Sequence, residues 1–71
     1  MSVDRYSAIR GYADEMSRMV SEKLISNLTA EGSIALYAKF LCDWDKSPTS
    51  EGAVFQNGLS RYRELQEKGD A

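Results

Sequence analysis

Few residues in this chain of 71 combine the types and spacing that catalytic chemistry requires. It contains no histidine and a single cysteine, Cys42. A reactive thiolate needs a nearby base, and a zinc or other transition-metal site needs several His or Cys ligands. A glycine-rich phosphate loop, a CxxC pair and an HExxH motif are also absent from the sequence. We therefore expect a non-catalytic protein without a metal or cofactor.

The most suggestive polar cluster is Asp43 and Asp45, which flank Trp44. Two carboxylates can act together as general acid and general base only if they point toward one site. Residues two apart on a helix point to different sides, so the sequence predicts a solvated helix end instead. Cys42 lies on the apolar side of the same segment, and we expect it to be buried as a small hydrophobic side chain.

The charge balance gives little support to nucleic-acid binding. The chain has 9 basic and 11 acidic residues and a net charge of −2, whereas such binding depends on a basic surface. Near the C-terminus, the basic Arg61, Arg63 and Lys68 alternate with Glu64 and Glu67. This pattern predicts a solvated surface of mixed charge.

The sequence also indicates where the protein acts. The longest apolar run, residues 34–38, is far shorter than the roughly 20 residues that cross a membrane. The first residues, MSVDRYS, contain an acid and no apolar segment of the kind a signal peptide has. We expect a cytoplasmic protein of a bacterial or phage-infected cell.

Residues 29–46, TAEGSIALYAKFLCDWDK, are the segment around which the rest is organised. At about 100° per residue, eight side chains form a continuous apolar arc of roughly 240°. They are Leu36, Phe40, Trp44, Tyr37, Leu41, Ile34, Ala38 and Cys42. An ordinary surface helix has an apolar stripe of about 100°, so this pattern predicts a helix that is buried on two sides.

The segments on either side read as helices with one apolar face each. Residues 4–26 carry an apolar stripe of roughly 140°, as does the stretch from Val54 to Leu65. We expect a break at residues 27–29 with Thr29 as N-cap, and a third helix that opens at Ser47-Pro48 or at Thr49. The Asn57-Gly58 pair is also a hairpin signal, but the surrounding spacing favours a helix.

Two ion pairs are predicted on these outer helices. Asp14 and Arg18, and likewise Glu64 and Lys68, are spaced i,i+4 with the acid first, which is the favourable order.

Together these features predict an all-α fold, either a small three-helix bundle or a helical hairpin with a third helix, in a single domain over residues 1–71. A first helix of roughly 35 Å would extend beyond a globule about 29 Å across. Such overhang, together with the broad apolar arc and the small size, leads us to expect a homodimer.

The candidate binding surface lies at the edge of the central helix. Its middle, around Ile34, is sufficient to cover both outer helices. This leaves a ridge at i,i+4 spacing and a neighbouring tyrosine, namely Leu36, Phe40, Trp44 and Tyr37. Aromatic residues are enriched at interface anchors, so we expect this ridge to bind a partner protein. The competing interpretation places all the aromatic side chains in one internal core.

These inferences favour a small protein–protein interaction module that binds and modulates or inhibits a partner. In size and character the chain is similar to the small acidic helical proteins with which phages antagonise host regulators or defence complexes, a likeness that no motif carries. The alternative is an accessory subunit or nucleoid-associated partner of a DNA-binding protein.

Overall fold

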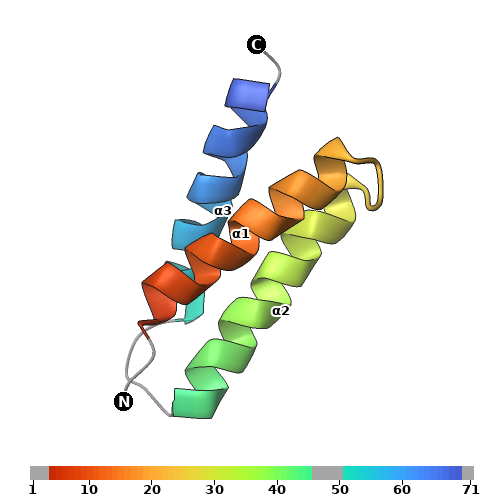
Figure 1. Ribbon diagram of the computed structural model, residues 1–71. Helices are drawn as coiled ribbons and strands as arrows, with labels where there is room; N and C mark the ends of the chain where they lie inside the picture. The colour runs from red at the N-terminus through yellow and green to blue at the C-terminus, as the bar shows by residue number, and fades with distance from the viewer. Residues whose placement is uncertain (1–3, 46–50, 70–71) are drawn as a thin grey trace.

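The computed structural model describes residues 4–45 and 51–69, except for the side chains of residues 44, 45 and 69. It contains three helices, α1 (Arg5–Ser21), α2 (Asn27–Asp45) and α3 (Glu51–Gly69). α1 and α2 run antiparallel from a tight turn, and α3 packs back across α1 (Figure 1). The predicted all-α three-helix bundle is thereby confirmed, in a molecule of 38 × 21 × 18 Å.

Asp4 caps the start of α1. It lies just before the helix in an extended conformation, and its Oδ1 accepts a hydrogen bond from the Tyr6 N–H at 3.0 Å. The Ser7 hydroxyl donates to the other carboxylate oxygen at 2.9 Å. These bonds satisfy a backbone donor that has no partner within the helix.

α1 ends earlier than the sequence indicates. Lys23 adopts a positive φ of 62°, and its N–H donates to the Val20 carbonyl while the Leu24 N–H donates to Met19. This is the Schellman arrangement, which terminates a helix. The predicted end at residue 26 is wrong, and so is the predicted overhang: 17 residues span only about 26 Å.

α2 begins before the predicted cap. The Thr29 N–H donates to the Ser26 hydroxyl at 3.2 Å, and that hydroxyl also contacts the Thr29 side chain at 3.0 Å. Ser26 is therefore the N-cap, and residues 27–29 are the first turn of the helix rather than a break. This correction adds Leu28 to α2.

α3 is a continuous helix through Asn57 and Gly58, so the hairpin alternative is wrong. The two predicted starts of this helix, at Ser47-Pro48 and at Thr49, lie outside the described residues.

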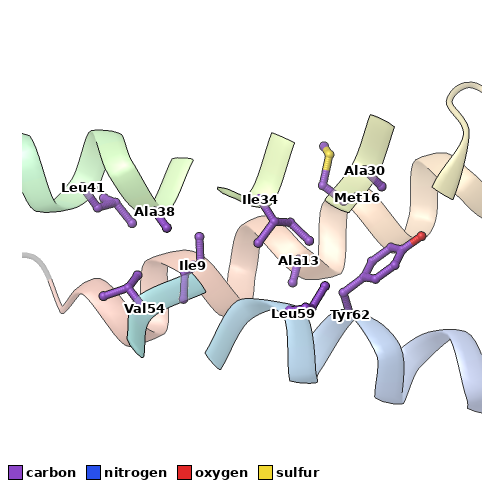
Figure 2. Packing of buried hydrophobic residues seen from close by; sticks show 10 residues of the cluster. All are labelled: Ile9, Ala13, Met16, Ala30, Ile34, Ala38, Leu41, Val54, Leu59 and Tyr62. Atoms are coloured by element: carbon purple, nitrogen blue, oxygen red, sulfur yellow. The ribbon is translucent and has the colours of Figure 1, made fainter. Parts of the chain in front are cut away.

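The core lies where all three helices meet. Figure 2 shows Ile34 of α2 and Leu59 of α3 pointing toward each other beside Ala13 of α1. The buried hydrophobic side chains are Ile9, Ala13, Met16, Ala30, Ile34, Ala38, Leu41, Val54, Leu59 and Tyr62. As predicted, α2 contacts both other helices.

At Gly58, α3 comes close to both other helices. A Cβ atom there would lie 2.5 Å from Cγ1 of Ile9 and 3.1 Å from Cγ2 of Ile34. Glycine at this position lets α3 approach α1 and α2 more closely than any other residue would allow.

Polar contacts fasten α3 to the other two helices. The Tyr62 hydroxyl donates to the Asn27 side chain at the start of α2. The Gln66 amide donates to the buried Ser17 hydroxyl of α1 at 2.8 Å. Because both bonds are formed by partly buried groups, they fix how α3 sits along the other helices.

The predicted ion pairs have different outcomes. Asp14 does not pair with Arg18; it contacts Arg61 of α3 at 2.8 Å, whereas Arg18 pairs with Glu15 and Glu22. The pair between Glu64 and Lys68 is confirmed at 3.3 Å.

Cys42 is only partly buried, at the edge of the core cluster. The prediction of a buried small hydrophobic side chain is met only in part, because Cys42 packs against the core from beside the inner face of α2 rather than at its centre.

Candidate protein-interaction surface

The side of α2 that faces away from the core carries a row of apolar residues. Leu28, Gly32, Leu36 and Phe40 repeat at four-residue intervals, so they follow one ridge along the helix. We call this row the outer face of α2. Leu28 is 84 % exposed, Leu36 70 % and Phe40 54 %. Three large apolar side chains therefore stand in one row, each more than half exposed, with Gly32 between Leu28 and Leu36.

Tyr37 connects the outer face to the interior. Its ring packs against Tyr12 of α1, with centroids 4.4 Å apart and a tilt of 34°. The Phe40 ring lies parallel to it within 9° at 6.1 Å. This chain of aromatic rings holds Phe40 against the bundle while leaving much of its surface open. Tyr37 itself is partly buried.

The structure places the four sequence-predicted residues unequally. Leu36 and Phe40 are exposed, and Tyr37 is partly buried between them and the core. These positions are the ones expected of a ridge that lies beside the core. Trp44 belongs to the helical backbone of α2, and its side chain lies outside the described part of the structure. The binding role of all four remains a prediction.

The sequence reasoning missed Leu28 as a member of this surface, because it placed residues 27–29 in a break between helices. A signal was present. Ser26 is as good an N-cap as Thr29, and Leu28 stands eight residues before Leu36, in the same row.

Gly32 occupies the middle of the row. A Cβ atom at this position would meet nothing within 4 Å. Glycine inside a helix is less stable than alanine by up to about 1 kcal/mol, and no contact inside the described chain accounts for it. The outer face therefore has a shallow depression between two protruding leucines.

The outer face has a small polar border. Lys39 and Asp43 are exposed and lie on the same side of α2, so this side carries one charge of each sign. Protein–protein interfaces likewise combine apolar side chains with charged ones beside them.

A second surface feature is an open groove between α1 and α3 of about 800 Å³. Its charged lining residues are Arg10, Asp14, Arg61 and Glu64. Arg61 contacts Asp14 at 2.8 Å and Glu64 at 3.8 Å, and its hydrogen bond to Asp14 raises the pKa of the guanidinium. With two charges of each sign, these four residues give the groove no net charge.

The C-terminal basic residues are neutralised by carboxylates. Arg63 lies 3.8 Å from Glu31 of α2, and Arg61 and Lys68 are engaged as described above. This is the predicted surface of mixed charge.

The described residues 4–45 and 51–69 contain no group of three or more His, Cys, Asp or Glu side chains placed to hold a metal ion. No helix among them is both long and apolar enough to cross a membrane.

Comparison of the chain with protein-family models, with curated proteins and with solved structures finds no match.

Proposed function

We propose that this protein is a small non-catalytic interaction module that binds another protein through the outer face of α2 and so modulates or inhibits it. One observation carries the proposal: the apolar row of Leu28, Leu36 and Phe40 is exposed on a helix whose opposite side already fills the core. Leu28 and Leu36 in particular are so exposed that internal packing accounts for little of their apolar character. Partner binding accounts for it, because it would remove them from water.

The proposed contact includes Tyr37 and Trp44 as well as Leu36 and Phe40. The ring of Tyr37 stacks on the ring of Phe40 and so helps to fix its position. Trp44 continues the row by one further helical turn. Inhibition then needs no chemistry of its own, since covering a partner's working surface is sufficient.

The test is affinity capture from bacterial lysate with three immobilised versions of the full chain. They are the wild type, Leu36→Glu and Gln56→Glu. Gln56 is exposed on α3, away from the outer face, so the last variant adds a negative charge elsewhere. Circular dichroism establishes that all three are equally helical.

We expect the wild type and Gln56→Glu to retain the same stoichiometric protein, and Leu36→Glu to bind it at least roughly thirtyfold more weakly. Equal capture by all three versions, or no specific capture by any, contradicts the proposal.

A further inference from the structure

We propose that the outer face of α2 binds the outer face of a second copy of this chain, with the two α2 helices antiparallel and crossing between Gly32 and Leu36. This inference rests on the proposed function, because it takes the same surface to be a protein-binding one and adds a second copy of the chain as an occupant of it.

Size complementarity supports this arrangement. A twofold axis between Gly32 and Leu36 sets Leu36 of each copy over Gly32 of the other, and Leu28 opposite Phe40. The depression at Gly32, where a Cβ atom would meet nothing within 4 Å, then receives a leucine that is 70 % exposed in the single chain. Rows at four-residue spacing pack into one another when two helices cross at about −50°.

Charge complementarity supports the antiparallel direction. Asp43 lies exposed in the last turns of α2, where the negative end of the helix dipole disfavours a carboxylate. In the antiparallel pair each Asp43 approaches the exposed Lys23 in the turn before the other copy's α2, while Lys39 lies opposite Thr29. A parallel pair would place the two Asp43 carboxylates together.

The area of the face sets the strength of the pair. Leu28, Leu36 and Phe40 together expose on the order of 400 Å², about half of the ~800 Å² that each partner buries in a standard interface. The dimer therefore belongs to the weak, reversible class, and we expect it to form from micromolar concentration upward.

The first test is sedimentation equilibrium of the untagged full chain from micromolar to millimolar concentration. We expect a reversible monomer–dimer equilibrium for the wild type and for Gln56→Glu. Leu36→Glu should remain a monomer throughout while keeping its helical circular dichroism, because it places two carboxylates at the centre of the contact.

The second test uses two helical glycines, Gly32 and Gly11, each of which faces open space. Gly32→Gln and Gly11→Gln each replace an interior helical glycine that has nothing within 4 Å by a better helix former, so both should melt at higher temperature than the wild type. Only Gly32→Gln fills the depression that receives Leu36, and it alone should weaken dimerisation, by roughly tenfold or more. If Gly32 had only a structural role, Gly32→Gln and Gly11→Gln would not differ in their effect on dimerisation.

The outcomes for self-association and for binding another protein are distinguishable. A wild type that stays monomeric to millimolar concentration overturns this inference, even if Leu36→Glu loses a captured partner, which would leave the proposed function standing. Dimerisation that Leu36→Glu and Gly32→Gln leave unchanged places the contact elsewhere and also overturns it. A dimer disrupted by both variants supports it, whether or not a further protein is captured.

Discussion

At the scale of single residues, Lys23 is the only non-glycine residue with a positive φ in the described chain. It occupies the position after the end of α1 that most proteins give to glycine. The left-handed conformation costs a side-chain-bearing residue about 1 kcal/mol because Cβ crowds the backbone. We predict that Lys23→Gly raises the free energy of unfolding by about that amount, measured by urea denaturation at low micromolar concentration.

Lys23→Ala is the control, because it removes the charge but keeps the strained Cβ. It should give no comparable gain. Equal stabilisation by alanine would show that the charge, rather than the backbone conformation, limits stability at this position.

Gly58 and Gly11 make a second residue-scale prediction, since both are helical but only one is enclosed. A Cβ at Gly58 would lie 2.5 Å from Ile9, so Gly58→Ala must push α3 away from α1 and should cost about 1–3 kcal/mol. Gly11 has open space around it, and Gly11→Ala should gain up to about 1 kcal/mol. Thermal melts of the two variants should shift in opposite directions; a shift in the same direction would contradict the packing at Gly58.

At the scale of elements, the sequence predicted that three helices exist and which side of α2 packs inward, because both depend on periodicity. The end of α1 and the start of α2 could not be predicted in this way. A Schellman end at a lysine has no sequence signature, and Ser26 and Thr29 are both acceptable caps. The candidate site shares this limit: Leu36, Tyr37 and Phe40 followed from the helical wheel, whereas Leu28 depended on knowing where α2 begins.

The cap of α1 gives a prediction for pH. Hydrogen bonds from the Ser7 hydroxyl and then the Tyr6 N–H lower the pKa of Asp4 below its ordinary value of 3.8. The Asp4 carboxyl group therefore binds its proton less tightly in the folded state than in the unfolded chain. The resulting stability is fully present above the ordinary pKa and is lost as the pH falls through the lowered one.

Asp4→Asn tests this sign, because asparagine also caps a helix but does not titrate. We expect the difference in melting temperature between the wild type and Asp4→Asn to be constant from neutral pH to about pH 5 and to change in favour of the variant below about pH 4. A difference that stays constant down to about pH 2 would show that the Asp4 carboxylate is not tied to folding.

At the scale of the whole molecule, one small core is shared by all three helices, so no helix has a second core to rely on. Ile34 of α2 is fully buried among residues of α1 and α3. A chain of this size obtains only about 3–5 kcal/mol from such a core, and removing a buried Ile side chain costs about 2–5 kcal/mol. Ile34→Ala should therefore unfold most of the protein at 25 °C in a single cooperative loss of helical circular dichroism.

Leu36→Ala is the matched contrast on the same helix, two residues away. Leu36 is 70 % exposed, so this truncation removes little internal packing and should change the free energy of unfolding by no more than about 0.5 kcal/mol. At low protein concentration, the fold should therefore tolerate truncation on the outer face of α2 but not on the side of α2 that packs in the core. If Leu36→Ala unfolds the bundle as Ile34→Ala does, the outer face is part of the core. The apolar character of Leu36 would then be explained by folding and would no longer indicate a partner-binding surface.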